Sequence, residues 1–253
     1  MEPLVEIKNL SIRFPEGNST FEAVKGISFS IGKGEIVGVV GESGSGKSMS
    51  ALALMGLLPK DAEIASGSLC FQGEDLVTMK PEKRRQLCGS KMAMVFQEPM
   101  TSLNPVLKIE RQVGESLRIH TKLGNAEIHE RVVQALSEVG LPDPEGLCGK
   151  YPHELSGGMR QRVMIAQAMI NSPSLLIADE PTTALDCVVQ AQILELLRNI
   201  HRTKGTSILF ISHDLNVVRA LCSRVIVVYK GEIVEEGRSE ERRVGKEGGA
   251  GCA

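Results

Sequence analysis

The segment EIVGVVGESGSGKS, residues 35–48, decides the fold class of this chain. EIVGVV is a short apolar strand candidate, the loop GESGSGKS (Gly41–Ser48) follows it, and the apolar run ALALMGLL (Ala51–Leu58) predicts a buried helix. The GxxxxGK[ST] phosphate-binding loop requires this strand–loop–helix setting, so an accidental match in a glycine-rich turn is disfavoured. Its glycines let backbone N–H groups surround a phosphate at the positive end of a helix. The segment therefore predicts a nucleotide-binding protein.

The residues of this loop have distinct expected roles toward a nucleotide. Lys47 is expected to reach the β- and γ-phosphates of ATP, and the Ser48 hydroxyl to coordinate Mg²⁺. ATP and Mg²⁺ are accordingly the predicted cofactors. The residues expected to contact the nucleotide in this loop are Gly41, Ser43, Gly44, Ser45, Gly46, Lys47 and Ser48.

Short apolar segments alternate with helical patterns along most of the chain. The other strand candidates are VEIKNLSIRF (5–14), GISFSI (26–31), SLCFQG (68–73), KMAMVFQ (91–97), SLLIAD (174–179), SILFIS (207–212) and RVIVVYKG (224–231). An apolar stripe of Ile193, Leu196, Leu197 and Ile200 predicts a helix that ends at Gly205. The alternation predicts an α/β fold, in which a mainly parallel sheet flanked by helices forms a P-loop NTPase core.

Two segments depart from this alternation. At the N-terminus, the turn-rich PEGNST (15–20) lies between two strand candidates and predicts an antiparallel β subdomain. From about residue 100 to 155, strand candidates give way to helical patterns, and we expect a helical subdomain inserted into the core. Its clearest helix carries Ile128, Val132, Leu136 and Val139 on one face.

A pair of acids ends the strand candidate at 174–179. Asp179 is its last residue and Glu180 follows. A strand buried on both faces is not expected to end in two adjacent charges unless they face a cation or a reactive site. The alternative, two solvated acids at a strand end, is disfavoured beside a phosphate loop. We expect Asp179 to bind the Mg²⁺ of the nucleotide and Glu180 to act as general base on the attacking water.

The segment LSGGMRQR (155–162) distinguishes among the many phosphate-loop ATPases. Ser156 can cap a helix whose N-terminus carries Gly157 and Gly158 and is open to a phosphate. Taken alone, SGG before a helix is more often a plain cap. In this setting the segment resembles the signature motif of the ABC ATPases.

Four further positions resemble the same family, in the family's order. Phe14 stands where the family has an aromatic ring that stacks on adenine, with a core position as the alternative. Gln97 in MVFQEP resembles the glutamine that senses Mg²⁺ and the γ-phosphate, TTALD ending at Asp186 resembles the D-loop, and His213 in FISHD resembles the switch histidine. The resemblance implies catalytic roles for Glu180, His213 and Gln97, metal contacts for Ser48, Gln97 and Asp179, and nucleotide contacts for Phe14, Ser156, Gly157, Gly158 and Asp186.

The resemblance covers nearly the whole chain and implies partners. We expect one ABC ATPase domain over residues 1–237 and a disordered or non-native tail over 238–253. The family forms head-to-tail dimers, so a second ATPase subunit, identical or related, is expected, with Ser156 and Gly158 completing the ATP site of the other subunit. Integral-membrane permease subunits, a solute-binding protein acting through them, and a peripheral position on the cytoplasmic face of the inner membrane are also implied.

Two longer segments indicate the branch of the family. FQEPMTSLNP (96–105) and YPHELSGGMRQRVMIAQAM (151–169) resemble the ATP-binding subunits of peptide importers. The predicted function is ATP hydrolysis that drives import of di- or oligopeptides, with nickel, glutathione or another small solute as alternatives. A DNA-repair ABC ATPase is a remote alternative, because the interval between Gln97 and Leu155 holds neither coiled-coil heptads nor a CxxC pair.

Composition disfavours several other classes of protein. A formal net charge of −2 and an aromatic content of 3% do not indicate nucleic-acid binding. No run approaches the roughly 18 apolar residues of a membrane span, and MEPLVEIKNL lacks the layout of a secretory signal. The six cysteines form no CxxC pair, so reduced, mostly buried thiols are expected in place of a zinc site or a disulfide framework.

Overall fold

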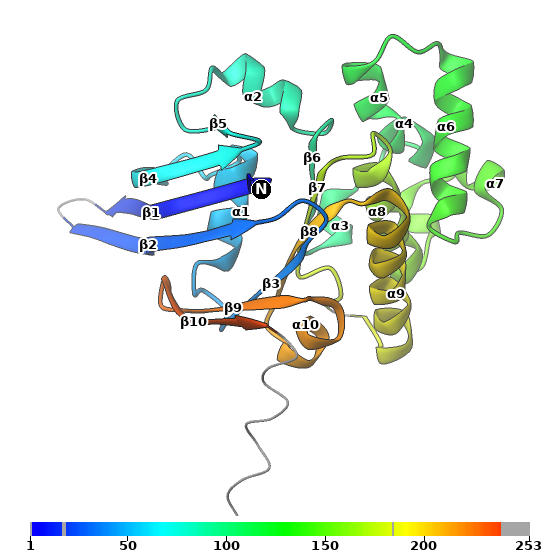
Figure 1. Ribbon diagram of the computed structural model, residues 1–253. Coiled ribbons are helices and arrows are strands. Elements are labelled where there is room, and N and C mark those ends of the chain that lie inside the picture. Colours follow the sequence, from blue (N-terminus) through cyan, green and yellow to red (C-terminus); the bar gives the residue numbers. More distant parts are fainter. Residues whose placement is uncertain (1, 17–18, 184, 239–253) are drawn as a thin grey trace, which may run out of the picture. The chain divides into compact units, whose positions relative to one another are not determined.

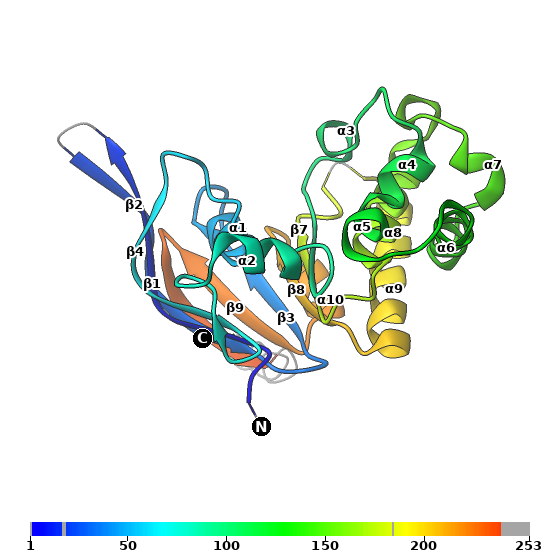
Figure 2. The same cartoon turned by 90° about the horizontal axis from the view of Figure 1, so that it is seen from above.

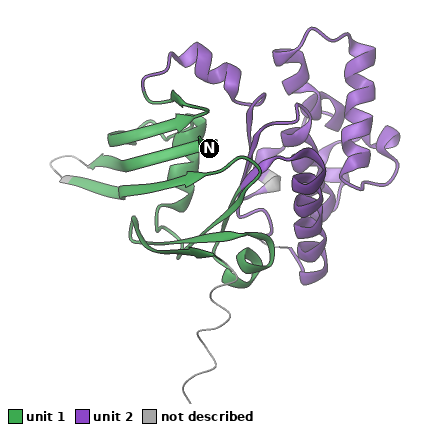
Figure 3. Ribbon diagram, in the orientation of Figure 1, with its two compact units in different colours: residues 1–77, 209–253 green, residues 78–208 purple. Residues whose placement is uncertain are grey.

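The computed structural model describes residues 2–16, 19–183 and 185–238. The predicted tail therefore lies outside the described residues, except for Arg238, which ends a strand. The chain forms two compact units, residues 1–77 with 209–253 and residues 78–208 (Figures 1 and 3). The first unit thus joins the two ends of the sequence.

The first unit contains an antiparallel sheet built mainly from the N-terminal segment. Its strands are β1 (Val5–Glu16), β2 (Ser19–Ile31), β4 (Glu63–Phe71) and β5 (Glu74–Asp75), in the order β2-β1-β4-β5. All three pairings are antiparallel. Alternate residues of β1, such as Val5 and Ile7, are fully buried, as the period of two in a half-buried strand requires. The predicted N-terminal antiparallel subdomain is confirmed.

The same unit contains parallel strands that carry the phosphate loop. β3 (Ile36–Val40), buried throughout, pairs in parallel with β9 (Arg224–Tyr229) and leads through the loop into α1 (Lys47–Met55). Helix α10 (Leu215–Leu221) packs closely on β3, since a Cβ on Gly38 would lie 2.1 Å from Cγ1 of Val218. β8 (Ser207–Ser212), which enters this unit at Leu209, precedes this helix, and its six residues are all buried.

Two strands of the first unit were missed in the sequence, the two-residue β5 and the longer β10. β10 (Glu232–Arg238) pairs antiparallel with β9. Lys230 and Gly231, taken above as the end of a strand, both have positive φ, 48° and 87°. Two adjacent residues with positive φ form the tight turn that matches the twist of a hairpin. The prediction of a strand over 224–231 was therefore wrong at its last two residues.

The second unit is mainly helical, with two parallel strands. β6 (Met92–Val95) and β7 (Leu175–Asp179) pair in parallel. The helices are α2 (Pro81–Leu87), α3 (Pro99–Ser102), α4 (Ile109–Val113), α5 (Glu115–His120), α6 (Asn125–Glu138), α7 (Pro144–Cys148), η1 (Pro152–Glu154), α8 (Gly157–Met169) and α9 (Cys187–Lys204). Between β6 and β7 all regular elements are helical, in agreement with the loss of strand signal after residue 100.

Apolar faces position the long helices of this unit. α6 buries Ile128, Val132 and Leu136 as its periodicity predicts, and it lies beside α7 and α8 (Figure 2). α9 buries the predicted stripe and ends where Gly205 adopts a φ of 65°. Such a left-handed residue is common at the end of a helix, and glycine adopts it without the steric cost of a Cβ.

The cysteines and the helix lengths can both be set against the predictions made from the sequence. The cysteines of the described residues are all free thiols. Cys148 and Cys222 are buried, Cys70 and Cys88 are half-buried, and Cys187 is exposed, so burial is less general than predicted. No helix among the described residues has both the length and the apolar character needed to cross a membrane.

Candidate functional site

The phosphate loop curls around the ammonium group of its own lysine. Lys47 is the first residue of α1 and only 4% exposed. Its Nζ donates hydrogen bonds to the carbonyl oxygens of Gly41 (2.8 Å) and Glu42 (2.7 Å). A buried ammonium needs such acceptors, because desolvation without them is costly. The sequence therefore places a positive charge in the curve of the loop, at the N-terminus of a helix.

Close packing explains two of the loop's glycines. A Cβ on Gly41 would lie 2.1 Å from the carbonyl oxygen of Val228, and one on Gly46 would lie 2.3 Å from that of Ala23. Gly46 also has a φ of 96°, which L residues rarely adopt. The backbone of the loop thus lies so close to β2 and β9 that there is no room for a side chain at Gly41 or Gly46.

The loop also contains an unsatisfied buried hydroxyl. Ser45 is 4% exposed, and within the described residues its Oγ has no hydrogen-bond partner. Buried polar atoms in folded proteins are nearly always hydrogen-bonded, so each exception calls for an explanation. A phosphate oxygen in the loop would supply the missing partner, so the residues present fit the predicted nucleotide.

The paired acids Asp179 and Glu180 lie in the second unit, and two side chains donate hydrogen bonds to Glu180. Asp179 ends β7 and is 6% exposed. The next residue, Glu180, has a φ of 46°, and its Oε2 accepts hydrogen bonds from Nε2 of Gln97 (3.1 Å) and from Oγ1 of Thr183 (2.9 Å). Gln97 follows β6, which runs parallel to β7, so both residues extend from the carboxyl ends of adjacent strands. The structure thus brings the predicted Gln97 and Glu180 together.

Thr183 was missed in the sequence, where it was read only as part of TTALD. A threonine three residues after an acid can reach back to that side chain, but only where the backbone between them forms a turn. The backbone bond from Thr183 N–H to the carbonyl of Glu180 (3.1 Å) forms such a turn. The hydroxyl then reaches the carboxylate.

The signature segment begins a helix as predicted. Ser156 is the N-cap of α8, and its Oγ accepts a hydrogen bond from the N–H of Met159 (3.3 Å). A Cβ on Gly157 would meet nothing within 4 Å, whereas one on Gly158 would lie 2.8 Å from Cγ1 of Val189 in α9. The helix N-terminus is therefore open at Gly157 and closely packed at Gly158.

The structure also places the predicted site residues Asp186, His213 and Phe14. Asp186 is the N-cap of α9, with its Oδ1 accepting from the N–H groups of Val188 (3.0 Å) and Val189 (2.9 Å). His213 is exposed between β8 and α10. Phe14 lies opposite Phe21 in the β1–β2 register, with ring centroids 6.3 Å apart. These three residues are placed by the fold, and their roles toward a nucleotide remain predictions.

The sequence profile of one protein family, described as ABC transporter, matches residues 24–183. This chain belongs to the ABC transporter family. It is 47% identical over 238 residues to the dipeptide transport ATP-binding protein DppD of Haemophilus influenzae, covering 94% of this chain and 72% of that protein. It is 51% identical over 241 residues to the peptidoglycan transport ATP-binding protein YejF of Agrobacterium fabrum, covering 95% of this chain but only 44% of that protein.

Solved structures agree with this assignment. The post-hydrolysis dimer of the ATP-binding cassette MJ0796, bound to ADP and Pi, matches with a TM-score of 0.84 and 28% identity, over 93% of this chain and 98% of that one. The predicted α/β P-loop fold is therefore confirmed, and the chain is an ATP-binding protein of an ABC transporter with the ATPase activity of that family.

Proposed function

We propose that this ABC ATPase energises the uptake of di- or oligopeptides. The support comes from relatives named for the transport of dipeptides and oligopeptides, at 44–47% identity over most of this chain. Nickel or glutathione import would use the same ATPase chemistry, since the solute does not contact it. The proposed partners are two permease subunits in the inner membrane, a second ATPase subunit and a solute-binding protein, with this chain bound peripherally on the cytoplasmic face.

The observation that carries the proposed catalytic mechanism is the double hydrogen bond on Oε2 of Glu180. Gln97 and Thr183 both donate to this oxygen and so fix the orientation of the carboxyl group. A general base must be oriented toward the water from which it accepts the proton. The positive φ of Glu180 sets the direction of its side chain as it leaves the strand. Glu180 would accept the proton of the attacking water.

The remaining proposed roles follow from the chemistry of each side chain. Lys47 would exchange its two loop carbonyls for phosphate oxygens, and the Oγ of Ser45 would gain the partner that it lacks. Mg²⁺ would be held through Ser48, Asp179 and Gln97 and would neutralise phosphate charge when bound. Loop N–H groups from Gly41, Ser43, Gly44 and Gly46 would contact phosphate, Phe14 would stack on adenine, and His213 would contact the γ-phosphate. Ser156 and Gly158 would act on the nucleotide of the partner subunit, and Gly157 and Asp186 would also contact nucleotide.

A transport experiment tests the peptide proposal directly. A strain lacking this chain should lose uptake of a radiolabelled dipeptide, and the wild-type chain should restore it while Glu180→Gln does not. Uptake of labelled nickel and glutathione, measured in the same strains, provides the comparison. A strain that loses nickel or glutathione uptake but keeps dipeptide uptake would overturn the peptide proposal and leave the ATPase assignment standing.

A further inference from the structure

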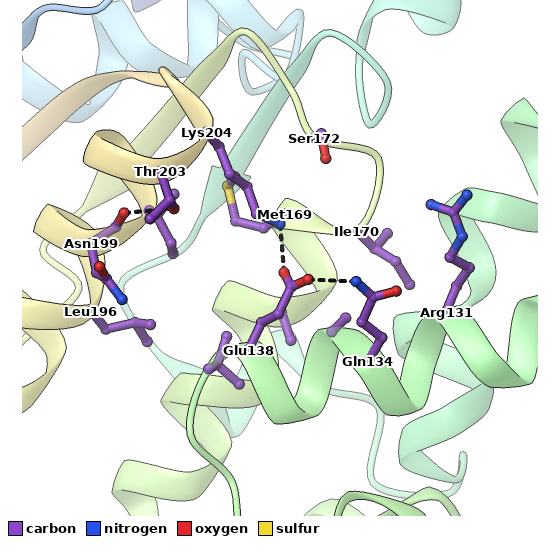
Figure 4. A pocket seen from close by; sticks show the side chains of 14 residues that line it. Arg131, Gln134, Glu138, Met169, Ile170, Ser172, Leu196, Asn199, Thr203 and Lys204 are labelled. Atoms are coloured by element: carbon purple, nitrogen blue, oxygen red, sulfur yellow. Dashed lines mark hydrogen bonds and ion pairs between the residues drawn. The ribbon is translucent and has the colours of Figure 1, made fainter.

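A cavity of about 430 Å³ lies in the second unit, away from every motif residue discussed above. α6, α8 and α9 frame it, as Figure 4 shows. Its lining begins on α8 at Ala166, ten residues after Ser156, which corresponds to roughly 15 Å along a helix. Its volume is within the range of small-molecule sites, about 300–1,000 Å³. The cavity is therefore separate from the nucleotide motifs at the starts of α8 and α9.

The floor of the cavity is apolar. Met169 and Ile170, at the end of α8, and Leu196 and Ile200, from α9, line it and are each less than 10% exposed. Ala135, Val139 and Ala166 complete this surface. Small-ligand sites characteristically combine such a floor with a few polar groups at fixed positions. The floor can hold the apolar body of a ligand.

Glu138 is the one carboxylate among the described residues that line the cavity, and both of its oxygens already have partners. Glu138 accepts a hydrogen bond at Oε1 from Nε2 of Gln134 (2.9 Å) and forms an ion pair at Oε2 with Nζ of Lys204 (2.6 Å). Both contacts are drawn in Figure 4. Each carboxylate oxygen thus has a donor, and the charge of Lys204 is compensated.

The second cation of the lining has no such compensation. Arg131 lies on α6 one turn before Gln134, and no described residue forms a hydrogen bond or an ion pair with its guanidinium. The described lining contains two cations, Arg131 and Lys204, and one anion, Glu138, so its net charge is positive by one. A guanidinium presents several donors in one plane and binds a carboxylate through two parallel hydrogen bonds.

We propose that this cavity is a binding site for a small amphiphile that bears one carboxylate group. Its head group binds Arg131, and its apolar body lies over Met169, Ile170, Leu196 and Ile200. A ligand in this position contacts three helices at once, α6, α8 and α9. Its binding therefore stabilises the folded chain and raises the melting temperature as its concentration increases.

Calorimetric titration of the full chain with decanoate, at saturating Mg-ATP, tests the proposal. Decanamide, which has the same chain length but no charge, is the control ligand. One saturable site for decanoate is expected, with decanamide binding at least about tenfold more weakly, the difference that a charge-assisted hydrogen bond typically makes. Equal binding of the two compounds, or no saturable site for decanoate, would overturn it.

Variants separate the cavity from other surfaces. Arg131→Gln should weaken decanoate binding at least about tenfold, whereas Arg131→Lys should retain part of it. Arg198→Gln, on α9 but outside the cavity lining, should have no effect. Ala135→Leu narrows the cavity and should also reduce binding, with thermal melts confirming that each variant folds. Unchanged decanoate binding in both Arg131→Gln and Ala135→Leu would show that the cavity is not the site.

Discussion

Gln97 and Glu180 lie 83 positions apart in the sequence, yet Nε2 of Gln97 donates a hydrogen bond of 3.1 Å to Oε2 of Glu180. This contact joins the segment after β6 to the segment after β7. Because these strands run parallel, the residues that follow them leave the same edge of the sheet. The predicted general base is thus oriented by a second predicted site residue.

The first prediction is that Glu180→Gln nearly abolishes ATP turnover while ATP binding is retained. The amide keeps the size of the side chain but cannot accept the proton, and loss of general-base action typically costs about 10²–10⁴-fold in rate. ATPase activity with the membrane partners present, together with equilibrium binding of a fluorescent ATP analogue, provides the measurement. Activity close to the wild-type rate would show that Glu180 is not the base.

The contrast between these residues shows how much of the site could be predicted from the sequence. Glu180 and Gln97 were identified because each belongs to a short motif in a fixed setting. The contact of Glu180 with Thr183 depends on a backbone φ of 46° at Glu180, and residue type does not reveal such a conformation. The hairpin turn at Lys230 and Gly231 was missed for a related reason, since the apolar pattern of β9 continued up to it.

Thr183→Val should lower kcat by about tenfold and leave the KM for ATP nearly unchanged. Valine keeps the shape of the side chain but removes the hydroxyl that donates to Glu180 over 2.9 Å, and a hydrogen bond of this kind is worth about 1–1.5 kcal/mol. Steady-state kinetics of both variants and wild type provide the test. Thr183→Ser keeps the donor and should retain most activity. If Val and Ser variants behave alike, the hydroxyl does not orient the base.

Lys47→Ala should weaken ATP binding itself, by roughly 10–100-fold, because a charge-assisted contact with the phosphates is lost. A fluorescent ATP analogue measures the dissociation constant directly. Lys60→Ala, at an exposed position after α1, is the matched control and should bind normally. An unchanged dissociation constant for a folded Lys47→Ala would mean that the loop does not bind phosphate through this ammonium.

His129 gives the helical segment of the second unit a pH-dependent contact. Its Nδ1 lies 3.0 Å from Oε1 of Glu110 in α4, and its Nε2 lies 2.9 Å from Oε1 of Glu145 in α7. Carboxylates only accept hydrogen bonds, so both contacts require the doubly protonated ring. The hydrogen bond to Glu110, and then that to Glu145, raises the pKa of His129 above its ordinary value of 6.5.

The resulting stability has a defined direction with pH. Because the folded pKa of His129 is raised, its contribution is complete below pH 6.5 and is lost as pH rises through the folded value. The melting temperature of wild type should therefore exceed that of His129→Gln at acidic pH, and the difference should shrink at alkaline pH. A difference that is constant with pH would indicate that protonation of His129 does not matter.

The last prediction concerns assembly. Ser156→Arg should leave ATP binding by the isolated subunit nearly intact but suppress ATP-dependent dimerisation and hydrolysis. Ser156 caps α8, where Gly157 leaves the helix N-terminus open, and a bulky cation there would prevent a partner's γ-phosphate from approaching. Sedimentation of the Glu180→Gln variant with ATP and the cognate second ATPase should show a dimer. The double variant that carries both Glu180→Gln and Ser156→Arg should sediment as a monomer under the same conditions.

Loss of the cap must be separated from loss of the interface. Removing a serine N-cap costs about 1 kcal/mol of stability, so Ser156→Arg could weaken the dimer by loosening α8 alone. Ser156→Ala removes the same hydrogen bond to Met159 without adding bulk or charge, and it should still dimerise with ATP. Two outcomes contradict the prediction: a Ser156→Arg chain that dimerises normally, or a Ser156→Ala chain that fails to the same extent. The first would show that the signature does not contact nucleotide across the dimer, and the second that Ser156 acts only as a helix cap.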